Sequence, residues 1–268
     1  MATFTPAFGI ICLISVLISA GGFLYFVYFF SVCYGFSIAG MSVAMMVLFW
    51  GGMDTWMKAI CILLTVYGLR LGIYLLVREA KGSYRKIMRP ETDANVSKRA
   101  PGYKFAIWLV VASLYIGQVS PVFFRIQNGT GADTCAIIGF FTALLGVVIE
   151  GASDAQKFRL KKEHPHEFCR TGLYRIVRCP NYFGEILLWT GVLLFGITSL
   201  SGFWQWFLAI WGYALILWVM FSGARRLELR QNKNYGNRPE YQEYVRKVPI
   251  IIPLVPIYSV VKHKWLVG

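Results

Sequence analysis

The feature that most constrains this chain is a series of apolar windows, each close to the length that crosses a lipid bilayer. A bilayer's hydrocarbon layer requires roughly 20 helical residues. The windows approach that length at residues 7–30, 33–52, 56–77, 103–124, 134–152, 181–200 and 202–222. Backbone groups in lipid must find hydrogen bonds within their own segment, so each window is predicted to be a helix. We expect an all-α integral membrane protein with seven transmembrane helices in one bundle.

Composition agrees with this class. The chain is 57% hydrophobic and only 15% charged, whereas soluble domains are about a quarter charged. The first window lacks the basic start and the small-residue cleavage site of a signal peptide, so we expect it to remain in the mature protein. No internal repeat or separate soluble stretch is visible. Residues 1–268 are therefore expected to form a single membrane domain, and a monomer.

Lys and Arg residues are concentrated in three segments. Residues 78–104 hold eight, residues 157–178 hold seven and the tail from residue 223 holds nine, which is 24 of the 27 in the chain. Seven spans place all three segments on one side, and the positive-inside rule makes that side the cytoplasm. We expect an outside or lumenal N-terminus and a cytosolic C-terminus, in the endoplasmic reticulum membrane of a eukaryote or the inner membrane of a bacterium.

Charge and cysteine patterns also exclude some function classes. The net charge of +14 is confined to loops between apolar windows, which membrane topology explains without a nucleic-acid partner. The six cysteines form no Cys-x-x-Cys pair and mostly lie in apolar windows. This pattern argues against a zinc site and against a disulfide framework, so we expect packing cysteines and no metal.

Residues 171–185, with the sequence TGLYRIVRCPNYFGE, concentrate the chemistry of the chain. Pro180 suits the first turn of a helix, where a missing N–H has no consequence, so a helix is predicted to begin near residues 179–181 and to run through Leu200. The N–H groups of that turn favour an anion, and two candidate anion-binding side chains, Arg170 and Arg178, lie just upstream.

Asn181 and Glu185 are four residues apart, so they share one face of that predicted helix. Glu185 is one turn inside apolar surroundings. A carboxylate in such a place is costly and usually functional.

A second polar stripe lies in the third window, where Tyr67, Arg70, Tyr74 and Arg78 recur at helical spacing. Such a stripe must face the bundle interior or water. Tyr74 and Arg78 are equally well explained as residues of the membrane interface, the tyrosine in the aromatic belt and the arginine snorkelling. Tyr67 and Arg70 lie deeper, and for them we favour a site.

Two further charged groups are candidates. Glu150 and Asp154 are four apart on one helix face, where they would repel unless hydroxyls, amides or cations hold them. They could hold a ribose or an adenine amino group, or form an ion-pair network with the lysines that follow. Arg226 and Arg230 are one turn apart on a helix continuing from the last window. They could face a phosphate together, or lipid headgroups.

The run TGLYRIVRCPNYFGEILLWTG resembles the signature of the membrane steroid 5α-reductase family, which includes bacterial 5α-reductase-like proteins and the C-terminal domain of the eukaryotic enzymes. Other elements fall in the family's order and spacing: the Tyr67 to Tyr74 row, Gln118, Ser153-Asp154 and the closing Tyr244 to Pro253. The resemblance covers roughly residues 60–255, and the first 55 residues match poorly.

The resemblance implies a seven-helix bundle that binds NADPH from the cytosol and reduces the C=C bond of an enone lipid, such as a 3-oxo-Δ4 steroid. It would make Tyr67 the donor to the substrate carbonyl, with Arg70 orienting that phenol. Asn181 and Glu185 would lie at the nicotinamide end. The adenosine ribose would lie by Asp154 and Glu150, and the phosphates by Lys161 and the tail arginines.

The chemistry itself supports these roles. Hydride addition to an enone leaves charge on the carbonyl oxygen, which a phenol in an apolar pocket stabilises. No side chain supplies a hydride, so a cofactor must.

One departure from the family stands out. Relatives carry an acid on their second helix beside the catalytic tyrosine, whereas the equivalent stretch here, residues 41–45, is uncharged. The only acid before Glu79 is Asp54. Either a shifted register brings Asp54 to Tyr67, or this chain lacks that acid.

The alternative function is methyl transfer from S-adenosylmethionine, because the Arg-x-Pro-x-Tyr-x-Gly core also resembles isoprenylcysteine carboxyl methyltransferases. Those enzymes carry His before the Pro and a Glu-Glu pair after the last span. Here Cys179 replaces the His and Glu228 stands alone. A non-catalytic lipid-binding protein is a third possibility, and sterol reductases of the C14 or Δ7 type are a variant of the first.

Overall fold

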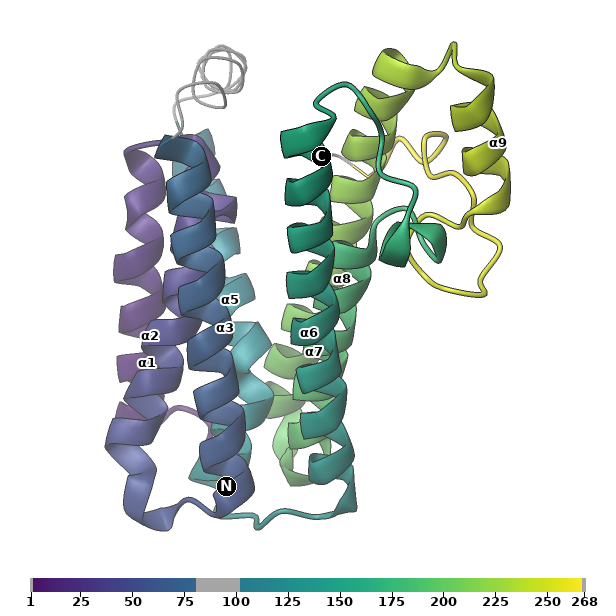
Figure 1. Cartoon of the computed structure of the whole chain (residues 1–268). Coiled ribbons are helices and arrows are strands. Elements are labelled where there is room, and N and C mark those ends of the chain that lie inside the picture. The colour runs from purple at the N-terminus through teal and green to yellow at the C-terminus, as the bar shows by residue number, and fades with distance from the viewer. Residues whose placement is uncertain (1, 81–101, 267–268) are drawn as a thin grey trace. The chain divides into compact units, whose positions relative to one another are not determined.

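The computed structural model describes residues 2–80 and 102–266, and helices dominate these parts of the chain (Figure 1). The main helices are α1 (Pro6–Ser19), α2 (Val32–Phe49), α3 (Thr55–Ala80), α5 (Tyr103–Gln127), α6 (Thr134–Glu163), α7 (Pro180–Gly196), α8 (Gly202–Tyr235) and α9 (Pro239–Lys247). Short 3₁₀ turns join them: η1 (Ala20–Phe23), η2 (Phe26–Phe30), η3 (Trp50–Gly52), η4 (Gly172–Arg175) and η5 (Ile197–Ser199). The basic segment 81–101 lies outside the described residues.

The predicted all-α membrane fold is confirmed. Within the described residues, seven helices are long and apolar enough to cross a membrane: Pro6–Phe23, Val32–Gly52, Thr55–Glu79, Tyr103–Gln127, Thr134–Glu163, Pro180–Ser199 and Gly202–Tyr235. Large apolar side chains are exposed along them, as at Leu17, Val47 and Val148. A surface of this kind suits lipid, and the chain is a multi-pass membrane protein.

The first span is shorter than the apolar window predicted. The window ran to residue 30, but α1 and η1 end at Phe23 and the chain turns into η2. The cause is a close contact, because the Phe29 ring lies where a Gly22 side chain would be, 2.1 Å from the position of a Cβ atom. Apolar residues 24–30 therefore pack against the end of the first span instead of extending it.

Two spans are longer than their apolar windows. The sequence predicted that the fifth helix ends at residues 150–154, whereas α6 continues to Glu163. The last helix also continues past its window, as the tail pattern predicted, and α8 ends only at Tyr235. Polar residues in these extensions are good helix formers, and apolar windows do not detect them.

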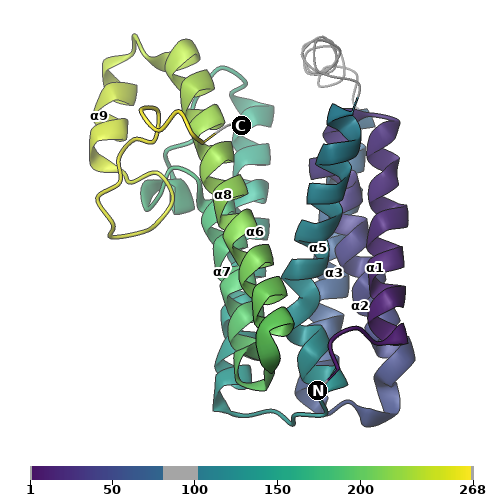
Figure 2. The same cartoon turned by 180° about the vertical axis from the view of Figure 1, so that it is seen from behind.

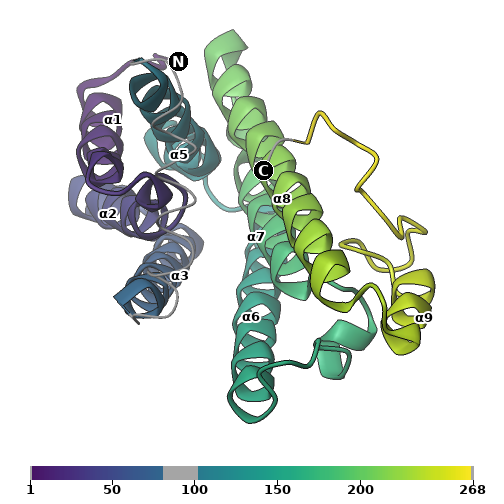
Figure 3. The ribbon, with the colours of Figure 1, turned by 90° about the horizontal axis from the view of Figure 1, so that it is seen from above.

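The chain divides into two compact units. Unit 1 comprises Met1–Phe140 and Val192–Tyr213. In it α1, α2, α3 and α5 lie side by side (Figure 3), and α2 packs most extensively on α3. Gly35 and Gly68 allow that approach, since a Cβ atom on Gly68 would lie 2.5 Å from the Gly35 carbonyl oxygen. Backbones this close are typical of packed membrane helices.

A buried arginine holds one end of unit 1. The Arg125 side chain is 0% exposed and pairs with Asp133 at 3.1 Å. It also donates to the carbonyl oxygens of Phe195 and Gly131 and to the Thr198 hydroxyl. These bonds tie the end of α5 to the turn before α6 and to the end of α7. The sequence analysis did not identify this cluster.

Unit 2 comprises Phe141–Gly191 and Ala214–Gly268. Its helices α6 and α7 cross with their backbones in contact, because Gly146 and Gly184 face one another. A Cβ atom on Gly146 would lie 2.4 Å from the Leu188 nitrogen, and one on Gly184 would lie 2.7 Å from the Glu150 nitrogen. α9 packs beside the end of α8 (Figure 2). The aromatic rings of Phe168, Tyr235 and Tyr241 meet there.

Candidate functional site

The start of α7 is fixed by the C-terminal segment. The helix begins at Pro180, as predicted, and ends at Gly196, with η5 continuing it to Ser199. Before it, the N–H groups of Arg178 and Cys179 donate to the carbonyl oxygens of Pro249 and Ile250, both at 2.9 Å. Unit 2 therefore holds the first turn of α7 rigidly, which a site built on that turn requires.

Two buried carboxylates lie by the crossing of α6 and α7. Glu150 is 3% exposed and Glu185 is 7% exposed. The Trp189 indole, one turn further along α7, donates to a Glu185 oxygen at 3.4 Å. Asn181 is half-buried on the same helix, one turn before Glu185. The predicted pairing of Asn181 and Glu185 on a single helix face is therefore in place.

A chain of tyrosine hydrogen bonds fixes the helix turn that carries Asp154. The Tyr244 hydroxyl donates to the Tyr174 carbonyl oxygen at 2.6 Å, and the Tyr174 hydroxyl donates to the Ser153 carbonyl oxygen at 3.3 Å. Burial raises the pKa of both phenols above the ordinary tyrosine value. Both therefore remain protonated donors at neutral pH, and α9 is linked through the loop to Asp154.

Arg178 is engaged within the protein, although the sequence analysis assigned it to a cofactor. Its guanidinium pairs with Glu228 at 3.0 Å, and both side chains are 1% exposed. It also donates to the Tyr258 carbonyl oxygen, and the second Glu228 oxygen accepts the Val260 N–H at 2.9 Å. This buried pair locks the C-terminal segment onto α8. The neighbouring Cys179 thiol is buried as well, which raises its pKa to about 12.

Lys161 and Arg170 also have partners in unit 2. The Lys161 ammonium donates to the carbonyl oxygens of Pro165 and Glu167 and to the Tyr235 hydroxyl, at 2.6–3.0 Å. Three bonds use all of its donors. Arg170 forms an exposed pair with Glu240 at 3.1 Å. In contrast, Arg226 and Arg230 are exposed on α8, one turn apart, so an anion in water can reach them.

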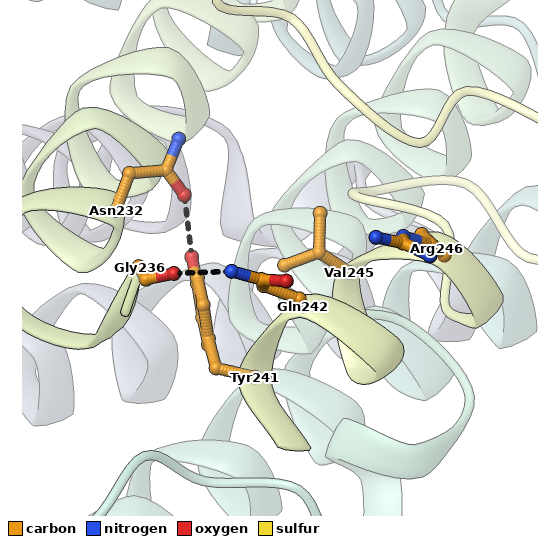
Figure 4. Close-up of a pocket in the computed structure, with 6 residues that line it drawn as sticks. All are labelled: Asn232, Gly236, Tyr241, Gln242, Val245 and Arg246. Atoms are coloured by element: carbon orange, nitrogen blue, oxygen red, sulfur yellow. Dashed lines mark hydrogen bonds between the residues drawn. The ribbon is translucent and has the colours of Figure 1, made fainter. Parts of the chain in front are cut away.

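A small hollow of about 270 Å³ opens where α8 meets α9 (Figure 4). It is lined by Asn232, Gly236, Tyr241, Gln242, Val245 and Arg246. The Tyr241 hydroxyl donates to the Asn232 side chain at 2.8 Å, and the Gln242 amide donates to the Gly236 carbonyl oxygen at 2.9 Å. These bonds hold the turn between the two helices.

Unit 1 contains a separate cluster of buried polar groups. Tyr67 is 0% exposed on α3, and its hydroxyl lies 3.3 Å from that of Tyr34 on α2. The Gln118 amide, from α5, donates to the Tyr34 hydroxyl at 3.2 Å. Arg70 lies one turn after Tyr67, with its guanidinium 5.9 Å from the centre of the Tyr67 ring. The sequence analysis singled out Tyr67 and Arg70 but missed Tyr34.

Asp54 does not lie beside Tyr67. It comes just before α3, thirteen residues ahead of Tyr67, which is roughly 20 Å along a helix. Both of its oxygens accept backbone bonds, from Met57 at 2.8 Å and from Ala132 at 2.9 Å. Asp54 therefore caps α3 and holds the turn before α6, and the residue of α2 that reaches Tyr67 is Tyr34.

Residues 27–248 match a family model described as a protein of unknown function (DUF1295). No solved structure matches the chain.

Curated relatives fall into two enzyme classes. A 3-oxo-5-alpha-steroid 4-dehydrogenase 1 from Rattus norvegicus is 27% identical over 45% of this chain and 42% of its own length. A protein-S-isoprenylcysteine O-methyltransferase from Saccharomyces cerevisiae is 30% identical over 44% of this chain and 46% of its own. A methyltransferase of the same name, form B, from Arabidopsis thaliana is 24% identical over 46% and 57%. The chain thus spans roughly half the length of the relatives it matches.

Proposed function

Because this chain belongs to the DUF1295 family, whose relatives include membrane steroid reductases, we propose that it reduces the C=C bond of an enone lipid with NADPH. The proposed substrate is a 3-oxo-Δ4 steroid or a related sterol. The observation that carries the proposal is the phenol of Tyr67, fully buried within an apolar membrane helix and hydrogen-bonded to a second phenol. A polar group so placed is expected to serve a polar atom of an apolar ligand.

The proposed role of Tyr67 is to donate a hydrogen bond to the substrate carbonyl oxygen. Negative charge develops on that oxygen as the double bond is reduced, and a phenol in a low-dielectric site stabilises it. Arg70 lies one turn from Tyr67, and its positive charge would favour the same developing charge. Both residues act most strongly in the transition state and so affect turnover more than binding.

NADPH would supply the hydride for this reaction. Unit 2 offers residue types that suit such a cofactor: Asn181 and Glu185 for an amide, Glu150 and Asp154 for hydroxyls or an amino group, and Arg226 and Arg230 for phosphate. The exposed position of the two arginines on α8 fits a ligand that arrives from water. Arg178 and Lys161 would support this site indirectly, because their donors already bind protein groups.

Methyl transfer from S-adenosylmethionine is the second candidate, supported by the methyltransferase relatives. Two observations count against it. Glu228 is committed to Arg178 and Val260, and so is poorly placed to bind a cationic cofactor. Cys179 is a buried thiol whose pKa is raised to about 12, so it would supply neither a base nor a charged group.

The test is a binding competition followed by turnover. Purified protein in detergent would be titrated with NADPH and, separately, with S-adenosylmethionine. We expect saturable NADPH binding, and oxidation of NADPH when a 3-oxo-Δ4 steroid is added. Binding of S-adenosylmethionine alone, together with no enone reduction, would replace the reductase proposal with methyl transfer.

A further inference from the structure

Three buried polar side chains meet in unit 1, each from a different helix. Tyr34 comes from α2, Tyr67 from α3 and Gln118 from α5, and they are 7%, 0% and 3% exposed. The two phenol oxygens are 3.3 Å apart, and the Gln118 nitrogen is 3.2 Å from the Tyr34 oxygen. Tyr34 is therefore the middle member of a hydrogen-bonded series.

The order of this series determines which proton Tyr67 can offer. A phenol has one proton to donate and two lone pairs that accept. Because the Tyr34 oxygen accepts the amide proton of Gln118, its own proton is available for the Tyr67 oxygen. Tyr67 then retains its proton for a third oxygen. Hydrogen bonds in series polarise one another, so this order makes Tyr67 a stronger donor.

Gln118 provides a second, independent observation. Its side-chain oxygen is buried and has no hydrogen-bond partner among the described residues. Buried acceptors are nearly always satisfied in proteins, and exceptions tend to occur at functional sites. If the amide were turned round, its oxygen would take the Tyr34 proton and Tyr67 would lose that support. The observed orientation favours a donor series that ends at Tyr67.

We propose that Tyr34 is a positioning residue for Tyr67 and that Gln118 fixes the direction of their shared hydrogen bond. This inference rests on the proposed reduction, in which Tyr67 donates to the substrate carbonyl oxygen. When that oxygen binds, Tyr34 donates to Tyr67 and Tyr67 donates to the substrate. Tyr34 thus provides, from α2, the support that Asp54 cannot give from the far end of α3.

The test is Tyr34→Phe, which removes the hydroxyl and keeps the ring. We expect kcat to fall about tenfold or more, while KM and the NADPH Kd change less than about twofold. Gln118→Leu should give a smaller loss of the same kind. The double variant should lose less than the product of the two single effects, because both residues act through one series.

Tyr115→Phe is the matched control. Tyr115 is also a buried tyrosine of unit 1, its ring lies 5.2 Å from that of Tyr34, and its hydroxyl donates to the Phe29 carbonyl oxygen. Its removal tests packing and stability without touching Tyr67. We expect kcat within about twofold of the wild type.

A readout independent of turnover is the ¹⁹F chemical shift of 3-fluorotyrosine placed at position 67. It should move in Tyr34→Phe and stay in Tyr115→Phe. A wild-type kcat in Tyr34→Phe, beside an inactive Tyr67→Phe, would overturn the positioning role and leave the reductase function standing. A wild-type protein that reduces no enone would overturn the function, and this role with it.

Discussion

Tyr67 is the side chain whose smallest change should have the largest effect on the proposed reaction. Tyr67→Phe removes a donor that acts mainly as charge develops, so kcat and kcat/KM should fall together by about 10²–10³. The ring still fills its space, and NADPH affinity should be retained. Steady-state kinetics beside NADPH titration measures both quantities. Full activity of the variant on every enone that the wild type accepts would rule out the mechanism.

Asn181 and Glu185 are expected to act on cofactor binding. Asn181→Ala and Glu185→Gln should each weaken NADPH affinity by about 1–3 kcal/mol, the usual loss when a buried polar group loses its partner. The measurement is equilibrium titration in detergent. Glu243→Gln is a matched control, because this carboxylate is exposed on α9 and pairs only with Lys247. Equal affinities in all four proteins would contradict the assignment.

At the residue scale, the sequence reveals polar groups that contrast with apolar neighbours. Glu185 and Arg70 are visible for that reason. Tyr34 is not, because an aromatic residue in an apolar window is equally typical of packing. The partners of Arg178 and Lys161 could not be predicted either. Glu228 is fifty residues away from Arg178 and Tyr235 is seventy-four away from Lys161, and only the fold brings them together.

At the scale of elements, the contact between α6 and α7 is set by glycine. Gly146→Ala would place a Cβ atom 2.4 Å from the Leu188 nitrogen, so the helices would have to separate. We expect a fall of several degrees in the midpoint of thermal unfolding in detergent, and weaker binding at the start of α7. Gly9→Ala on α1 is the control, since nothing lies within 4 Å of its Cβ position. Equal midpoints in the two variants would disprove the close crossing.

The Arg125 cluster should make the stability of unit 1 depend on pH. Burial alone would raise the Asp133 pKa, but hydrogen bonds from Thr198, Ala136 and Arg125, with the charge of Arg125, lower it from 3.8 to about 2. A depressed pKa stabilises the fold above the unfolded value, and that contribution is lost as pH falls from about 4 towards 2.

Asp133→Asn is therefore expected to lower the thermal midpoint at pH 7, with the difference from wild type narrowing as pH falls towards 2. Solvent screens this half-exposed carboxylate, so the effect should be moderate. Tryptophan fluorescence during heating measures it. Glu240→Gln, at an exposed pair with Arg170, should show little difference at any pH. A constant gap between Asp133→Asn and wild type across that range would refute the explanation.

Helix existence followed from the sequence because spans need apolar length, whereas helix ends depend on particular contacts. Pro180 gave the start of α7 correctly, since proline suits a first turn. The end of the first span could not be predicted, because it depends on the Phe29 ring meeting Gly22. The ends of α6 and α8 lie in polar residues, where apolar periodicity carries no information.

For the whole molecule, charge distribution predicts the orientation in the membrane. Single cysteines at positions 163 and 242, in a chain whose native cysteines are replaced, should react with an impermeant maleimide from the cytoplasmic side. Cysteines at positions 131 and 201 should react from the other side. Contacts within unit 2 support the first pairing, since Lys161 binds Tyr235 and Glu167 binds Arg238. Labelling of 163 and 242 from opposite sides would remove the topology.

The length of α8 has a further consequence. Its 34 residues extend about 51 Å at 1.5 Å per residue, whereas the hydrocarbon layer is about 30 Å thick. Roughly 20 Å of this helix therefore stands in the headgroups and the water beyond, and Arg226 and Arg230 lie on that part. Their height above the lipid phosphates is set by how deeply the helix sits, which membranes of different thickness change. Bilayer thickness thereby becomes a variable that decides whether the two arginines meet lipid phosphates or a dissolved anion.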